Sequence, residues 1–126
     1  MENSTMQRGP EQWFLDAHPE RGSVRVQVST GRGLFPVEGA RVEIYRRLGP
    51  EQTVFYEGVT DASGIAEDIR LPALPAGWSQ SAETAGISGT VYQVSVRHPQ
   101  HGTVEGRPVT VFPRIETVLA VSLGAA

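Results

Sequence analysis

The sequence predicts an all-β protein built as a sandwich of two antiparallel sheets. Fourteen glycines and nine prolines separate short runs of Val, Ile, Tyr, Phe and Thr, a pattern typical of many short strands. In several runs apolar and polar residues alternate, as they do in a strand with one buried face. No segment has a convincing apolar spacing of 3.6 residues. Seven runs of this kind predict a seven-stranded sandwich.

The first two runs, residues 23–30 and 41–47, alternate cleanly between apolar and polar side chains. This alternation predicts strands that turn one face to the core and the other to water. The side chains expected in the core are Val24, Val26, Val28, Val42 and Ile44.

The third run, residues 53–60, has three apolar residues in succession, so alternation does not fix its phase, and we place Val54 and Tyr56 inward. The segment Asp61-Ala62-Ser63-Gly64 follows it. Aspartate favours the first position of a turn and glycine accepts a positive φ, so this segment predicts a hairpin. Residues 65–71 would then return antiparallel to the third run and bury Ile65, Ile69 and Leu71.

The last three runs, residues 91–97, 104–112 and 115–123, complete the set. Two sheets packed face to face bury the inward side chains of all seven strands in a common core. We expect that core to contain Val24, Val26, Val28, Val42, Ile44, Ile69, Tyr92, Val94, Val96, Val109, Val111, Ile115, Leu119 and Val121.

Two segments lie outside the strand pattern. Residues 72–90 form a connection much longer than the usual four to six or so residues, and such loops are usually functional or mobile. The first 21 residues form a polar arm, flexible or docking, with one apolar stretch at 13–15. In this arm Pro10 can start a short helical turn and Pro19 must stop it. Residues 22–126 are the expected single domain, and a chain of 126 residues has no room for a second domain of normal size.

Composition excludes several classes of function. The formal net charge is −3 and the pI is about 5.6, which argues against a nucleic-acid surface. No apolar stretch approaches the roughly twenty residues that span a bilayer. Residues 1–19 carry four charges and no long apolar run, so no secretion signal is expected. We therefore expect synthesis in the cytoplasm, with association with the cell envelope or the spore left open.

The chain has no cysteine, and all eleven basic residues are arginines. Disulfides and thiolate metal sites are therefore excluded. Without lysine the chain has no amine for a Schiff base or for an isopeptide cross-link. The sequence calls for no cofactor and no metal ion.

Two turn motifs resemble a known family. They are the run from Pro36 to Ile44, of the form Pro-x-x-Gly-Ala-x-Val, and the later Thr-Asp-x-x-Gly of residues 60–64. Through them, residues 22–123 resemble the carboxypeptidase regulatory-like family. That likeness implies a transthyretin-like (prealbumin-like) Greek-key sandwich.

A bacterial subset of this family, found alone or joined to cell-wall and spore-cortex hydrolases, is similar in two further segments. They are Leu-Pro-Ala-Leu-Pro at 71–75 and the strand from Tyr92 to Val96. The chain departs from the family at residues 98–102, His-Pro-Gln-His-Gly, where a Gly-Tyr pair is more common.

By analogy of fold, the resemblance implies a binding or assembly module that is not an enzyme. The expected partner is another protein or a cell-wall glycan, and exposed sheet edges or the arm offer a route to a homo-oligomer. Two alternatives stay open. One is a structural or decoration subunit of a phage or secretion particle, and the other is a small transthyretin-like hydrolase using Arg97, His98 and His101.

Aromatic and arginine side chains are the candidate binding residues. A tryptophan either packs on its own protein or serves a partner, which singles out Trp78 in the long loop and Trp13 in the arm. Phe14, next to Trp13, is a candidate binding residue as well. Tyr45 and Arg47, with Arg41, form an outward strip on the second run that suits an acidic group.

The three histidines are weighed as metal ligands and set aside. A three-histidine zinc site would need His18, His98 and His101 within about 2.1 Å of one ion. Pro99 and Gly102 instead indicate a loop at the end of a strand, so solvated loop histidines are expected. No pair of carboxylates is placed by the sequence to act as acid and base.

Overall fold

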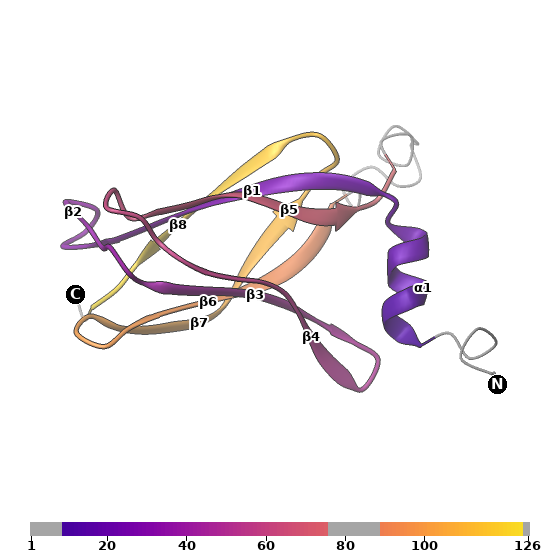
Figure 1. Cartoon of the computed structure of the whole chain (residues 1–126), viewed down its shortest axis with the longest axis horizontal. Helices are drawn as coiled ribbons and strands as arrows, with labels where there is room; N and C mark the ends of the chain where they lie inside the picture. The colour runs from indigo at the N-terminus through magenta and orange to yellow at the C-terminus, as the bar shows by residue number, and fades with distance from the viewer. Residues whose placement is uncertain (1–8, 76–88, 125–126) are drawn as a thin grey trace.

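The computed structural model describes residues 9–75 and 89–124. In this part of the chain one helix precedes eight strands (Figure 1). The elements are α1 (Pro10–Ala17), β1 (Glu20–Thr30), β2 (Phe35–Pro36), β3 (Arg41–Leu48), β4 (Glu51–Val59), β5 (Ile65–Ala73), β6 (Thr90–His98), β7 (Gly102–Val111) and β8 (Glu116–Ser122).

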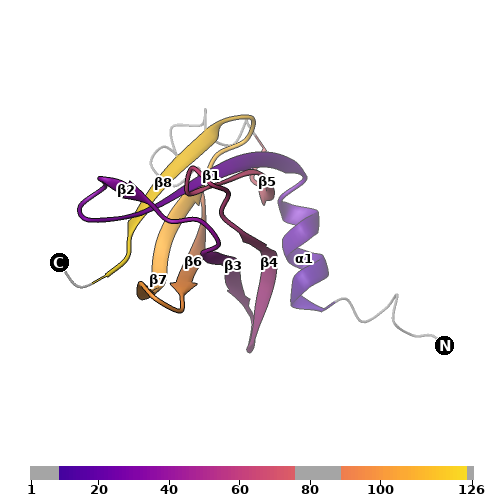
Figure 2. The same ribbon diagram turned by 60° about the vertical axis from the view of Figure 1, so that its left-hand side comes forward.

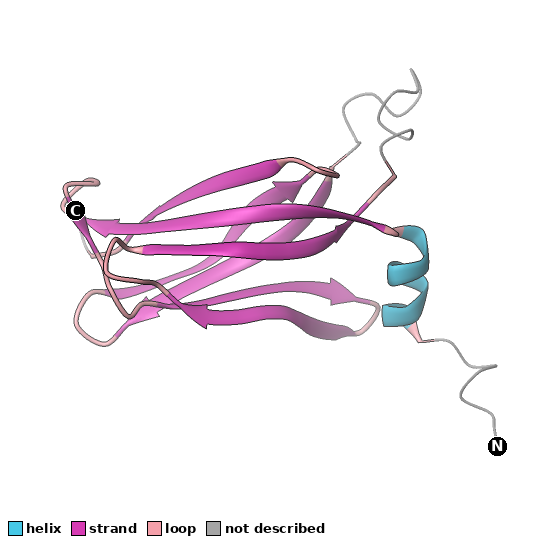
Figure 3. Cartoon of the chain, turned by 45° about the horizontal axis from the view of Figure 1, so that its top comes forward, coloured by secondary structure: helices cyan, strands magenta, loops and turns pink. Residues whose placement is uncertain are grey.

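The strands form two sheets that lie face to face (Figure 3). In the first sheet β1 pairs with β2 and β5 in antiparallel fashion and with β8 in parallel. The second sheet has the order β4-β3-β6-β7 and is antiparallel throughout. The predicted sandwich is confirmed.

The strand count and one strand direction differ from the prediction. The described chain has eight strands, because the short β2 adds to the predicted seven. β8 runs parallel to β1, with Ser23 opposite Glu116 and Ser29 opposite Ser122. β7 belongs to the other sheet, so β8 reaches β1 by crossing between layers, and no hairpin sets its direction.

The turn at residues 61–64 forms as predicted, but the hairpin is wrong. Gly64 has a φ of 76°, and the Asp61 carboxylate accepts hydrogen bonds from the amides of Ser63 and Ile65 at 2.9 and 3.0 Å. However, β4 pairs with β3 and β5 pairs with β1. The turn therefore carries the chain from the second sheet to the first.

Hydrogen bonds on both sides of the turn explain this crossing. The buried Thr60 donates its hydroxyl to the Val37 carbonyl at 2.6 Å and accepts from the Ala40 amide at 2.9 Å. On the other side, the Gly64 carbonyl accepts from the Val28 amide at 2.7 Å. Each end of the turn is thus fixed to a different part of the fold.

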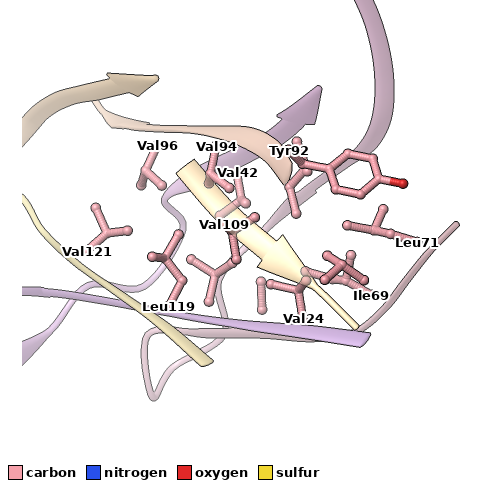
Figure 4. Packing of buried hydrophobic residues seen from close by; sticks show 14 of the residues in the cluster. Val24, Val42, Ile69, Leu71, Tyr92, Val94, Val96, Val109, Leu119 and Val121 are labelled. Atoms are coloured by element: carbon pink, nitrogen blue, oxygen red, sulfur yellow. The ribbon is translucent and has the colours of Figure 1, made fainter. Parts of the chain in front are cut away.

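The core lies between the sheets and contains every residue of the predicted set but one (Figure 4). It also contains residues outside that set, such as Val37, Ala40 and Leu48. Ile115 was expected inside, but its side chain is 55% exposed. It precedes β8 in a turn, where its carbonyl accepts a hydrogen bond from the Ser23 amide at 3.1 Å. The other predicted core residues, from Val24 to Val121, are buried.

Bulges shift part of the predicted pattern in two strands, and in the first of them Tyr56 packs on the core as predicted while Val54 does not. Ile44 faces Tyr56 and Tyr45 faces Val54, so Phe55 is an extra residue in β4. Phe55 and Tyr56 therefore both pack on the core, whereas Val54 is 45% exposed.

A second bulge lies in β5. Val24 faces Ile69 but Val26 faces Ala66, which leaves one extra residue between them on β5. Ile69 and Leu71 are buried as predicted, and the shift buries Ala66 and leaves Ile65 only partly buried. A bulge changes the side of the sheet on which the following residues lie.

Candidate functional site

The helix α1 spans one end of the sandwich, between the start of β1 and the turn that joins β3 to β4 (Figures 1 and 2). Pro10 begins the helix, as predicted, and packs on Gly49, where a Cβ would lie 2.9 Å from the proline ring. One turn further, Phe14 is only 8% exposed and belongs to the core. Pro10 and Phe14 are four residues apart, so they lie on one face of the helix. His18, four residues after Phe14, is the C-cap residue.

Phe14 completes an aromatic cluster at this end of the core. Its ring centroid lies 5.6 Å from that of Phe55 and 6.2 Å from that of Tyr92, with interplanar angles of 62° and 89°. Phe55 and Tyr92 meet at 5.2 Å and 78°. These edge-to-face arrangements add to the stabilisation from burial. The helix is therefore fixed to both strands by packed rings.

The Arg46 guanidinium group lies over the ring of Phe14. Its guanidinium carbon lies 4.9 Å from the centre of the Phe14 ring, within the range of a cation–π interaction. One of its Nη atoms donates to the Val91 carbonyl. Its Nε is buried with no hydrogen-bond partner in the described part of the chain.

His18 stacks on the ring of Phe14. The two ring centroids are 3.9 Å apart with an interplanar angle of 23°, and His18 Nδ1 donates to the Phe14 carbonyl at 2.7 Å. Burial lowers the pKa of His18, the hydrogen bond to Phe14 opposes this effect, and the Arg46 charge adds to the lowering. The histidine is therefore suited to its neutral form.

Tyr92 is fully buried, and its hydroxyl donates to the Pro72 carbonyl at 2.6 Å. Figure 4 shows the ring at the edge of the core with its oxygen pointing away from the valines. Burial raises the pKa of this hydroxyl far above its usual range. Tyr92 therefore joins the two sheets as a neutral donor.

Trp13 is the exposed member of this end of the molecule. Its side chain is 64% exposed, although its neighbour Phe14 is buried. Beside the first turn of α1, a groove of about 280 Å³ is lined by the start of the helix and by residues around the β3–β4 turn. The residues that line this groove are Gly9, Pro10, Glu11, Leu48, Pro50, Glu51 and Thr53.

The other predicted binding residues have different surroundings. Tyr45 lies half-buried on β3, where its oxygen accepts from the Ser95 hydroxyl at 3.2 Å, and Arg47 is exposed on the same strand. No hydrogen bond, ion pair or ring contact joins either of them to Trp13 within residues 9–75 and 89–124. Trp78 lies outside the described residues.

The structure separates the three histidines. His98 and His101 flank the β6–β7 turn with ring centroids 4.8 Å apart, and His98 Nδ1 accepts from the Gln100 amide at 3.1 Å. His18 follows α1 at the other end of the sandwich (Figure 1). No group of three or more His, Cys, Asp or Glu side chains among the described residues could hold a metal ion. The hydrolase alternative based on His98, His101 and Arg97 stays a prediction.

Sequence reasoning missed Arg46 and the role of His18. The spacing of Pro10, Phe14 and His18 was a signal for a helix with one anchored face. Nothing local to Arg46 shows that it meets Phe14, because the two residues are brought together only by the fold. No helix in the described part of the chain is long and apolar enough to cross a membrane.

Comparison with solved structures shows the fold. The Bacillus anthracis TIE protein aligns with 85% of this chain at 18% identity and a TM-score of 0.53. The aligned part is only 17% of that structure. The 5-hydroxyisourate hydrolase of Klebsiella pneumoniae aligns with 82% of this chain and 92% of its own at 13% identity and a TM-score of 0.50.

An (S)-allantoin synthase aligns with 85% of this chain and 42% of its own at 14% identity and a TM-score of 0.50. No family model and no curated protein matches the sequence. The chain has a transthyretin-like fold, as the sequence resemblance implied, while the carboxypeptidase regulatory-like family itself stays a prediction.

These comparisons correct one expectation. The chain was expected not to be an enzyme because of its fold, and that deduction is wrong, since the same fold carries a hydrolase and a synthase. At 13% and 14% identity the likeness shows the fold alone. It assigns no reaction to this chain.

Proposed function

We propose that the chain is a binding module of the bacterial cell envelope, and that it contacts a cell-wall glycan through Trp13. One observation carries this proposal. The Trp13 side chain is 64% exposed, and the helix that carries it is held in place by Phe14, whose ring packs in the core. A large aromatic side chain presented on a fixed element is typical of the residues that dominate binding energy.

The energetics favour a partner at this position. A tryptophan buries about 150–250 Å², so covering its exposed part is worth roughly 2–4 kcal/mol at about 25 cal/mol/Å². The helix is already ordered by the packing of Phe14 against Phe55 and Tyr92. Binding would therefore not have to order α1 first, which removes a common cost of association.

The flat apolar face of a sugar ring suits an exposed indole, and sugar hydroxyls suit the polar residues around it. Glu11 and Gln12 precede Trp13 and are exposed. The envelope location is supported by the resemblance of the turn motifs at residues 36–44 and 60–64 to the carboxypeptidase regulatory-like family. The oligomeric state stays a prediction.

Cosedimentation with purified, protein-free cell-wall sacculi tests the proposal. We expect Trp13→Ala to weaken binding about tenfold or more and Trp13→Phe to keep most of it, because phenylalanine retains a flat ring. Val118→Ala, a change at a 52% exposed residue of β8, is the matched control and should bind like the parent chain. Equal sedimentation of the parent chain and Trp13→Ala would exclude this surface.

A further inference from the structure

A cavity of about 340 Å³ opens on the outer face of the first sheet, at the end where β1 begins. Its walls come from β1, β5, the turn that leads into β8 and the first residue of β8, and none of them belongs to α1. Three arginines and two carboxylates are among the lining residues, which are Arg21, Gly22, Ser23, Asp68, Arg70, Arg114 and Glu116.

Strand register explains why these side chains meet. Ser23 lies in the middle of a row, opposite Arg70 on one side and Glu116 on the other. Arg70 alternates with the buried Ile69 and Leu71, so it lies on the outer face. Neighbouring strands are about 4.8 Å apart, which places the Arg70 and Glu116 backbones roughly 10 Å from each other across β1. A small molecule fits across that span.

Two unusual backbone conformations occur at this cavity. Asp68 has a φ of 61° and Arg114 a φ of 62°, and the described chain has only one other non-glycine residue with a positive φ, Arg32. Asp68 belongs to the bulge of β5, and the Arg114 amide donates to the Arg21 carbonyl at 2.8 Å. Bulges re-aim side chains and are frequent beside binding sites. Backbone strain likewise concentrates where a side chain is needed in one position.

The charges of the cavity are only partly paired. Arg114 Nε lies 3.5 Å from Glu20 Oε1. No carboxylate lies within 4.0 Å of the Arg21 or Arg70 guanidinium group in the part of the chain that the structure describes. Arg21 Nη1 donates to the Glu20 carbonyl at 3.4 Å, but neither guanidinium group is paired with a carboxylate among the described residues. Asp68 and Glu116 supply negative charge beside them.

We propose that this cavity binds a small ligand carrying a free carboxylate together with a free amino group, such as an unblocked dipeptide. Arg21 and Arg70 receive the carboxylate, because a guanidinium group matches its two oxygens. Asp68 and Glu116 receive the amino group and repel ligands that carry only negative charge. The volume lies at the lower end of the range of ligand pockets, which suits a ligand of dipeptide size.

Titration of the whole chain with L-alanyl-L-alanine, followed by amide NMR shifts, tests the proposal. We expect shifts at Ser23, Arg70 and Glu116 and a Kd of about 1 mM. Arg70→Gln should weaken binding about tenfold. Arg32→Gln, which removes an exposed arginine from the turn that follows β1, at the other end of that strand, is the matched control and should leave the Kd unchanged.

Asp68→Gly tests amino-group binding separately from carboxylate binding, since it removes one of the two carboxylates that receive the amino group. Glycine accepts the positive φ at this position, so the backbone should keep its conformation. This variant should bind acetate like the parent chain but bind the dipeptide more weakly. The carboxyl-terminal amide of the dipeptide should not bind. The proposal is overturned if the amide binds equally well, if Arg70→Gln has no effect, if only inorganic phosphate binds, or if no shift occurs up to about 20 mM dipeptide.

Discussion

At the scale of single residues, His18 is a titratable side chain whose pKa depends on how α1 packs on the sandwich. It stacks on Phe14 at 3.9 Å and lies beside the Arg46 charge. Burial lowers its pKa below the ordinary 6.5. The unfolded chain therefore takes up a proton at a higher pH than the folded chain. Stability from neutral His18 is fully present above pH 6.5 and is lost as the pH falls through 6.5 toward the lower folded pKa.

We therefore expect the free energy of unfolding to fall as the pH drops from about 7.5 to about 5.5. Urea denaturation at a series of pH values measures this change. His18→Gln should flatten the dependence, since glutamine can still donate to the Phe14 carbonyl but does not titrate. The double variant His98→Gln, His101→Gln is the control, and it should keep the part of the pH dependence that comes from His18. A dependence that persists unchanged in His18→Gln contradicts the assignment.

Which residues face the core was largely predictable at this scale, because alternation records the pleat of a strand. Val24, Val26 and Val28 show this. Alternation failed where an extra residue interrupts the pleat, as at Phe55 in β4. Of the site residues, Trp13 could be singled out by type alone, but its exposure and the burial of Phe14 depend on how α1 docks.

At the scale of elements, α1 depends on one side chain more than on its own propensity. The helix has eight residues, and its N-cap Gly9 makes no side-chain hydrogen bond. Isolated helices of this length are not stable in water. Phe14 is the only residue of α1 in the buried core, so its packing must supply most of the stability of the docked helix.

Truncation of neighbouring residues tests this dependence. Phe14→Ala should lower the free energy of unfolding by about 3 kcal/mol, the usual cost of removing a packed ring. Trp13→Ala, on the exposed side of the same turn, should change it by less than about 0.5 kcal/mol. Chemical denaturation of both variants gives the comparison. Similar losses in the two variants would mean that Phe14 does not anchor the helix.

The turn between β4 and β5 shows what local sequence leaves undetermined. Asp61 and Gly64 specify the turn itself, and both take the expected positions. They do not specify whether the next strand stays in the same sheet. That choice depends on Thr60 and on the bond between Gly64 and Val28, which join segments distant in sequence. The predicted hairpin failed for this reason, and so did the expectation that β8 lies antiparallel to its neighbour.

At the scale of the whole molecule, the two sheets share one core and are tied together beyond it. Tyr92 of the second sheet donates to the Pro72 carbonyl of the first at 2.6 Å. Between β7 and β8, the Thr117 hydroxyl donates to the Thr110 carbonyl at 2.9 Å. Neither sheet keeps a buried face if the other leaves. The sandwich should therefore unfold as one cooperative unit.

Native-state hydrogen exchange measures this cooperativity. The amides of Val26 in the first sheet and Val94 in the second are expected to exchange only by global unfolding, with free energies equal within about 0.5 kcal/mol. Phe14→Ala should lower both free energies by the same amount, although Phe14 lies at one end of the core. In a two-state protein, every amide that exchanges only by global unfolding reports the same free energy of unfolding. Amides of α1 serve as the reference for local opening. If Val26 and Val94 respond to Phe14→Ala by different amounts, the sheets open separately, and the shared core does not make them one unit.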